Sequence, residues 1–156
     1  MTTAVGRDFA DVFARELDRL ASELQAYADE ADLWETMGSQ KNPPGTLALH
    51  LVGNLMCYVG DGLGRTGYVR DREAEFADRN VPREELLRRV VECRETVTEV
   101  LSSMPDEAFE AVYGGETPTR MQGIGTRAFL VHLTWHLGWH LGHIYYHRLA
   151  IGPDVT

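Results

Sequence analysis

Five of the six histidines in this 156-residue chain lie within sixteen residues. They are His132, His136, His140, His143 and His147, separated by steps of four, four, three and four residues. An α-helix turns by about 100° per residue, so all five would share one stripe roughly 80° wide. Imidazole nitrogens are common ligands for zinc and other first-row divalent ions, so the stripe predicts a metal site.

The stripe is too long for all five side chains to share one ion. At about 1.5 Å per residue, His132 and His147 would lie roughly 22 Å apart along the helix axis. Only neighbours four residues apart can converge on one ion. The candidate pairs are His132/His136, His136/His140 and His143/His147. Spacing alone does not choose among these three pairs.

A third ligand has to come from elsewhere in the chain, because catalytic zinc-type sites generally have three protein ligands. The only other histidine is His50, which lies in an apolar stretch between Leu49 and Leu51. Helix bundles assemble such sites from side chains on facing helices. A three-histidine site drawn from two helices is therefore the leading hypothesis. The alternative is that His50 is a hydrogen-bonded core residue without a ligand role.

The elements that would position these histidines are four segments with helical patterns. They cover residues 8–28, 46–63, 82–103 and 126–150. Asp8 is a plausible N-cap for the first helix, and the second follows a Pro-Pro-Gly turn and is apolar nearly all round, as buried helices are. Pro82 begins the third helix, Thr126 can cap the fourth, and Gly152-Pro153 ends it.

No segment alternates as a strand does, so the predicted fold class is all-α, a four-helix bundle in a single domain over 1–156. The connections near 29–43, 62–81 and 104–125 are long for an up-and-down bundle. Long connections predict at least one crossover, in which consecutive helices run parallel rather than antiparallel.

Charge and composition exclude several classes of function. The formal net charge of −9 disfavours nucleic acid and anionic membrane surfaces, which both require a cationic protein face. Two cysteines cannot build a disulfide framework, and the start of the chain has no secretory pattern. The most apolar stretch contains five histidines and an arginine, unlike a membrane span. These features predict a cytoplasmic protein.

The residues around His50 resemble a known group of helical proteins. The stretch NPPGTLALHLVGNL, from Asn42 to Leu55, resembles the second helix of the DinB-like superfamily, which includes the YfiT-type metal proteins. The tract GYVRDREAEF, residues 67–76, is similar to one branch of that superfamily. His136 and His140 match the His-x-x-x-His motif of its fourth helix, and the resemblance covers most of the chain, up to Gly152.

The resemblance implies a four-helix bundle of DinB type, usually a homodimer, with zinc, nickel or iron held by His50, His136 and His140. Some relatives look like transferases or isomerases that use bacillithiol, mycothiol or glutathione, so a low-molecular-weight thiol is an implied cosubstrate. Leu141 and His143 stand where relatives often have Arg and Gln. These two departures leave the ligand triad undisturbed.

An ion held by neutral histidines keeps its charge and can lower the pKa of water or of a thiol. We therefore expect a metal-dependent thiol S-transferase or hydrolase acting on a small molecule. The alternative is a non-catalytic metal-binding stress or interaction protein that forms a dimeric bundle. Asn54 could orient a ligand or cap a neighbouring helix, and His143 could act as a base near the metal or pack in the core. No Asp or Glu lies within the fourth-helix histidine stretch.

Other polar and aromatic residues have two readings each. Arg70, in the glycine-flanked loop, could reach an anionic thiol or pair with a nearby acidic residue. Trp135 and Trp139, four residues apart, fit either the core or a dimer surface. His147 fits a satisfied core or interface histidine, and Cys57 fits a small buried hydrophobe.

Overall fold

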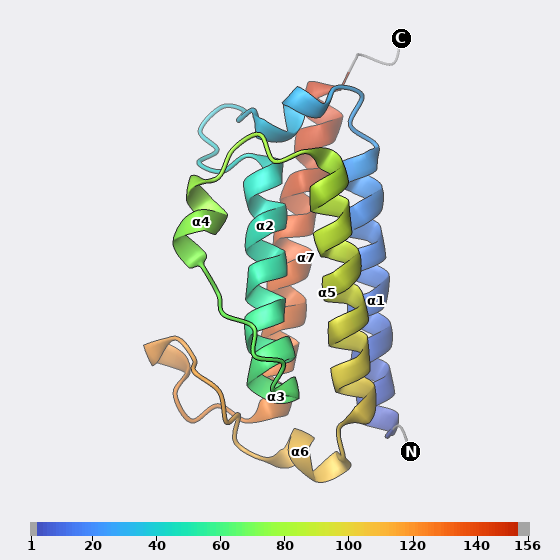
Figure 1. The fold of residues 1–156 in the computed structure, drawn as a ribbon, viewed down its shortest axis with the longest axis vertical. Coiled ribbons are helices and arrows are strands. Elements are labelled where there is room, and N and C mark those ends of the chain that lie inside the picture. Colours follow the sequence, from blue (N-terminus) through green and yellow to red (C-terminus); the bar gives the residue numbers. More distant parts are fainter. Residues whose placement is uncertain (1–2, 153–156) are drawn as a thin grey trace.

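Four long helices form most of the computed structural model, which describes residues 3–152 (Figure 1). They are α1 (Ala4–Gln25), α2 (Pro44–Leu55), α5 (Arg83–Ser103) and α7 (Thr126–Ile151). Within residues 3–152 there is no β-strand, only an isolated bridge between Val112 and Gly125. The all-α class predicted from the sequence is confirmed.

The first helix begins earlier than the sequence pattern predicts. Thr3, rather than Asp8, is the N-cap, and its hydroxyl accepts a hydrogen bond from the Gly6 amide at 3.0 Å. A side-chain oxygen at this position satisfies one of the amides that a helix start leaves without a partner. The apolar face of α1 packs along α5, where Leu17 and Leu20 are fully buried. Burying such a side chain stabilises the fold by about 1.5–3 kcal/mol.

The second helix starts at Pro44, two residues before the predicted start at 46, because proline suits the first position of a helix; all twelve residues of α2 are buried. It continues into a π-helical turn, η2 (Met56–Asp61), and then the short α3 (Gly62–Gly64). Arg65 adopts a left-handed backbone conformation, with φ at 55°, and ends the helical run.

The connection from α3 to α5 is the crossover that the loop lengths predict. It runs back along α2 to the end of the bundle where α2 begins, and α5 starts there, so α2 and α5 run parallel (Figure 1). Halfway along lies α4 (Arg72–Ala77), which the sequence analysis treats as loop. The Asp71 side chain caps α4 by accepting from the Ala74 amide, and α4 packs against α2.

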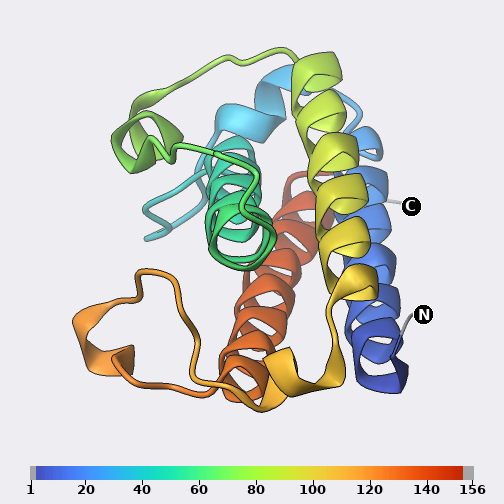
Figure 2. The same cartoon turned by 60° about the horizontal axis from the view of Figure 1, so that its bottom comes forward.

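The remaining connections contain short helical turns. They are η1 (Glu30–Trp34), α6 (Asp106–Glu110) and η3 (Thr119–Met121). The segment before α7 extends away from the long helices (Figure 2). Gly125, rather than Thr126, is the N-cap of α7, and Gly152 is its C-cap as expected. Pro153 lies outside the described residues.

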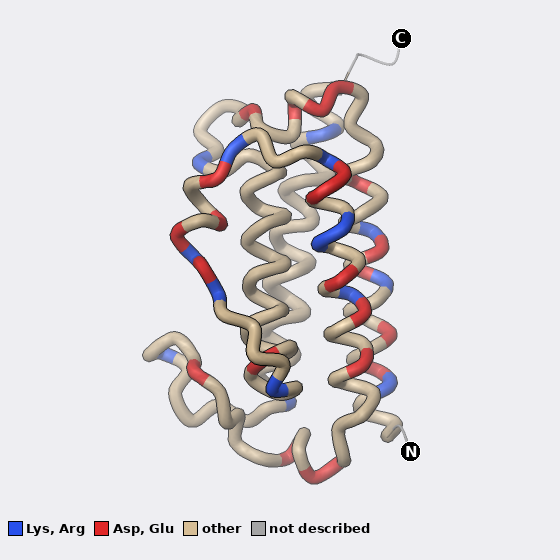
Figure 3. The backbone as a smooth tube through the Cα atoms, in the orientation of Figure 1, with Lys and Arg blue, Asp and Glu red and all other residues tan. Residues whose placement is uncertain are grey.

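Charge is distributed unevenly over the four long helices. Lys, Arg, Asp and Glu gather on α1, α5 and the crossover, whereas α2 and α7 are almost free of them (Figure 3). The two uncharged helices lie next to each other, so the interior between them is where polar imidazoles meet an apolar surround. Among the described residues, no helix has both the length and the apolar character needed to cross a bilayer.

Candidate metal centre

Helices α2 and α7 bring His50, His136 and His140 together. One possible ligand atom from each of the three histidines lies within 4.8 Å of the others. The ring centroids are 5.1 Å apart for His50 and His136, 5.5 Å for His50 and His140, and 4.7 Å for His136 and His140. Of the three pairs that spacing allows, His136/His140 is the one that faces His50. The structure groups the three histidines that the resemblance names.

The hydrogen bonds of His50 determine which of its nitrogens faces the cluster. His50 Nδ1 lies 3.0 Å from Glu75 Oε2, and His50 Nε2 lies 3.2 Å from His136 Nε2. Arg70 Nη2, a donor, also lies 3.3 Å from Nδ1, but it is farther away than the carboxylate and already donates to Glu75 Oε2 at 2.8 Å. An ionised carboxylate only accepts hydrogen bonds, so in a neutral His50 the proton resides on Nδ1. The lone pair on Nε2 then points toward His136. This carboxylate–histidine arrangement is typical of metal-binding histidines.

Arg70 holds the Glu75 carboxylate in place. Its Nε donates to Oε1 at 2.6 Å and its Nη2 donates to Oε2 at 2.8 Å, with both side chains largely buried. Burial by itself would raise the pKa of Glu75, but the hydrogen bonds from His50 and Arg70 outweigh it and hold that pKa below its usual value. Of the two readings of Arg70, the structure therefore shows pairing with an acidic residue.

The chain has room for the Glu75 carboxylate only because residue 53 is glycine. A Cβ built on Gly53 would lie 2.0 Å from Glu75 Oε1 and 2.6 Å from its Cδ. No side chain can occupy that space while the carboxylate remains there. Gly53 on α2 and Glu75 on α4 are thus complementary, and together they place an acceptor at His50 Nδ1.

His136 and His140 have the protonation state that metal ligation requires. Burial, reinforced by neighbouring histidines, lowers the pKa of His136 to about 3 and that of His140 to about 4. Both rings are therefore neutral at pH 7, with a lone pair free to bind a cation.

Two nitrogens of the cluster have no protein partner. Nδ1 of His136 and Nδ1 of His140 are buried without a hydrogen bond among the described residues. A buried polar atom left unsatisfied costs about 1–3 kcal/mol. Stability alone does not favour two histidines at these positions, so the donor set fits a metal site better than a hydrogen-bonded core.

The other residues singled out from the sequence lie near the cluster without joining it. Asn54, one helical turn after His50, is 7% exposed, and its Oδ1 has no hydrogen-bond partner in the described chain. His143 is exposed, with its ring 5.8 Å from that of His140. Cys57 is only partly buried.

His147 is a satisfied core histidine, one of the two readings made from the sequence. It is 2% exposed, its Nε2 donates to the Glu35 carbonyl at 3.0 Å, and the Tyr27 hydroxyl donates to its Nδ1 at 2.9 Å. With both nitrogens occupied, it is not available as a ligand. It ties α7 to the connection after η1 instead.

Glu75 and Gly53 were not identified from the sequence as parts of the site. The signal available was the charged run at 70–75, in which any of three acidic residues could pair with Arg70. The sequence does not show which of them reaches His50, because the contact spans twenty-five residues.

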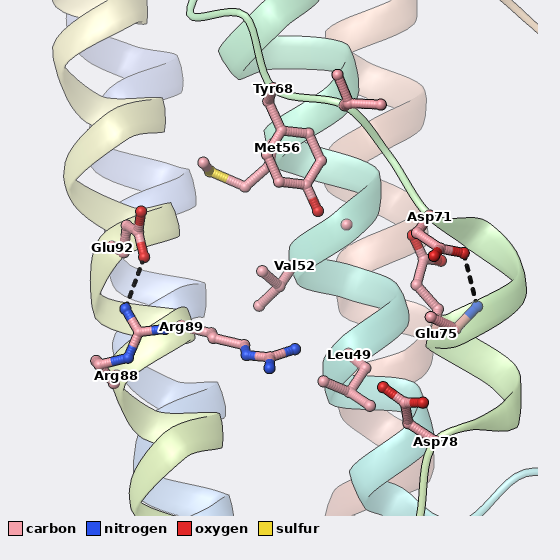
Figure 4. Close-up of a pocket in the computed structure, with 13 residues that line it drawn as sticks. Leu49, Val52, Met56, Tyr68, Asp71, Glu75, Asp78, Arg88, Arg89 and Glu92 are labelled. Atoms are coloured by element: carbon pink, nitrogen blue, oxygen red, sulfur yellow. Dashed lines mark hydrogen bonds and ion pairs between the residues drawn. The ribbon is translucent and has the colours of Figure 1, made fainter. Parts of the chain in front are cut away.

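The Glu75 side chain also lines a cavity. It has a volume of about 270 Å³ and lies between α2, α4 and α5 (Figure 4). Glu75 and Asp78 line one side, and Arg88 and Glu92 of α5 line the other, where they pair with each other at 3.1 Å. Its lining therefore has charges of both signs, and those of Glu75, Arg88 and Glu92 already have protein partners.

No family model and no curated protein matches this chain.

Proposed function

We propose that this chain is a DinB-like four-helix bundle that binds a divalent metal ion through His50, His136 and His140. The observation that carries the proposal is the convergence of three imidazoles within 4.8 Å. Zinc, nickel and iron(II) all accept nitrogen ligands of this kind. We further propose that the centre serves thiol S-transfer or hydrolysis on a small molecule.

The residues around the cluster have separable roles in such a centre. When bound, the ion would supply Lewis acidity, lowering the pKa of a water or thiol beside it. Glu75 keeps the proton of His50 on Nδ1, and Arg70 keeps Glu75 oriented through two hydrogen bonds. Asn54 offers a buried carbonyl oxygen that has no partner among residues 3–152 and could accept a hydrogen bond from a ligand.

A reaction requires that a small molecule reach the metal. His140 lines a cavity of about 230 Å³, so one side of the cluster is not sealed by the core. This access favours an enzyme over the alternative of a non-catalytic metal-binding protein. A purely stabilising metal site generally has a closed ligand sphere, whereas a catalytic one keeps an open position.

We also propose that the protein is a homodimer. The outer face of α7 exposes Val131, Trp135, Trp139 and Tyr146, each more than half accessible. Trp135 and Trp139 stack with ring centroids 5.8 Å apart. A row of large apolar side chains on one helix face is typical of an interface between subunits.

The metal site is tested by elemental analysis of the purified protein and by titration with zinc, nickel and iron(II). We expect one ion per chain in the wild type and none in His50→Ala, His136→Ala or His140→Ala. His132→Gln is the matched control, because His132 lies on the same stripe of α7 but outside the cluster. A wild type that binds no ion, with no rise in Tm on metal addition, would overturn the proposal.

The enzymatic role is tested separately with the metal-loaded protein. It should be assayed with small thiols and electrophiles, and with hydrolysable esters and amides. Turnover that is lost in His140→Ala but kept in His132→Gln supports an enzyme. Stoichiometric metal with no turnover in any of these assays supports the non-catalytic alternative.

A further inference from the structure

The cavity beside His140 contains the only lysine of the chain. Lys41 lines it together with Asn42, Pro44, Leu47 and three histidines of α7: His140, His143 and His147. Among the described residues that line this cavity none is acidic, although the chain carries 24 acidic residues and a net charge of −9. The Glu75-side cavity, by contrast, is lined by four acidic residues.

The ammonium group of Lys41 has no counter-charge within the described residues. By contrast, Arg70 near the metal centre pairs with Glu75, and Arg88 and Arg89 of α5 pair with Glu85. Lys41 forms neither an ion pair nor a side-chain hydrogen bond within residues 3–152. A cation beside an acid-free cavity attracts anions, because no neighbouring carboxylate cancels its field.

The loop that carries Lys41 is hydrogen-bonded to α7 at its start and contains a closed turn. His147 on α7 donates to the Glu35 carbonyl at the start of the loop, and the Gln40 amide donates to the Met37 carbonyl to close a turn. Pro43, whose ring fixes the backbone φ, follows Lys41 by two residues. Lys41 thus lies on a short loop that is tied to α7, the helix that carries His140.

We propose that this cavity is the substrate subsite, and that it selects small molecules with an anionic group. The carboxylate, sulfonate or phosphate would pair with Lys41, while a donor atom of the same molecule reaches the metal at His140. Pro44 and Leu47 supply an apolar wall for the carbon chain that joins the anionic group to the donor atom. This inference rests on the proposed metal centre, since it places one end of the molecule there.

The test uses cobalt-loaded protein and two series of small thiols as probes. Mercaptoacetate, mercaptopropionate and mercaptobutyrate are each compared with the neutral mercaptoalcohol of the same length. Binding is read from the visible absorption of cobalt and from calorimetry, neither of which requires turnover. We expect at least one mercaptocarboxylate to bind more tightly than its neutral partner.

Lys41→Gln should then remove the preference, and Lys41→Arg should retain it. An exposed ion pair contributes up to about 1 kcal/mol, so the expected loss is about two- to fivefold in affinity for the carboxylate probe alone. Arg15→Gln removes one positive charge from the exposed face of α1 and is the matched control. The Lys41 side chain is exposed, so its substitution should leave folding and metal content unchanged.

The outcomes separate the two proposals. If cobalt does not bind, the metal centre is wrong, and the subsite proposal fails with it. If cobalt binds but the mercaptocarboxylates bind no more tightly than the mercaptoalcohols, the metal centre stands and the anionic subsite is wrong. The same conclusion follows if Lys41→Gln retains the preference for the carboxylates. If Arg15→Gln weakens carboxylate binding as much as Lys41→Gln, the effect is one of net charge, and the subsite is also wrong.

Discussion

A single methyl group on Gly53 should weaken metal binding. Gly53 lies within α2, where glycine-to-alanine substitutions ordinarily stabilise a helix by up to about 1 kcal/mol. Here the new Cβ would lie 2.0 Å from Glu75 Oε1. The carboxylate must therefore move, and with it the acceptor that holds the proton of His50 on Nδ1.

The size of the effect follows from the distances. Ordinary van der Waals contact begins at about 3.4 Å, so Oε1 must retreat by 3.4 − 2.0 = 1.4 Å. The hydrogen bond from His50 Nδ1 to Glu75 Oε2 is 3.0 Å long and is lost beyond 3.5 Å. It therefore tolerates a lengthening of only 0.5 Å, less than the displacement of the carboxylate. Losing such a partner of a metal-binding histidine typically lowers metal affinity by about 10- to 100-fold. That corresponds to about 1.4–2.8 kcal/mol.

The assay is competition for zinc against a chromophoric chelator, with wild type, Gly53→Ala, Glu75→Gln and the double variant. Gly138→Ala is the matched control, since a Cβ there meets nothing within 4 Å and the residue lies between two of the ligands on α7. Chemical denaturation of the metal-free proteins shows whether each variant is folded. Gly53→Ala and Glu75→Gln should each lose affinity, and the double variant should lose no more than Glu75→Gln alone.

Two results would refute this reasoning. If Gly53→Ala binds zinc within twofold of the wild type, the carboxylate is not needed at its present position. If the losses of the two single variants add in the double variant, Gly53 acts by a route that does not pass through Glu75.

Three further predictions concern protonation, the core and the outer surface. For the metal-free protein, the free energy of unfolding should fall as pH decreases from 6.5 toward 4, because His136 and His140 are neutral when folded and take up protons on unfolding. The slope should be about 1.4 kcal/mol per pH unit for each histidine, measured by urea denaturation, and it should flatten when both are Gln. Tyr27→Phe should cost about 1–3 kcal/mol of stability, because its buried histidine partner loses a donor, with metal content unchanged. We expect the wild type to sediment as the proposed dimer in analytical ultracentrifugation and the Trp135→Ser, Trp139→Ser double variant to sediment as a monomer; a monomeric wild type would contradict that prediction.

Local patterns were sufficient to predict most of the helices. The proline at position 82 and the apolar spacing after it predict α5 almost to the residue, because helix starts and amphipathic faces are encoded within a few residues. Sequence patterns predicted helix ends less accurately where the end depends on a single capping hydrogen bond. Thr3 caps α1 instead of Asp8, and both residue types are suitable caps, so spacing could not distinguish them.

The connection from 65 to 82 shows the limit of local signals. Its length predicts a crossover, but its charged sequence gave no indication of α4. Helix α4 is six residues long, and isolated helices of that length are unstable in water. Packing against α2 stabilises it, and a partner so distant in sequence leaves no periodic pattern.

The sequence by itself determined that five histidines share one face of a helix, because that follows from the geometry of a helical turn. Together with a family resemblance, it indicated His50, His136 and His140 as ligands. Only the tertiary structure decided what surrounds them. Glu75 reaches His50 across twenty-five residues because Gly53 leaves space for it, and Lys41 lies beside His140 because His147 anchors its loop. These contacts join segments that are distant along the chain, and steric fit between such segments cannot be read from residue spacing.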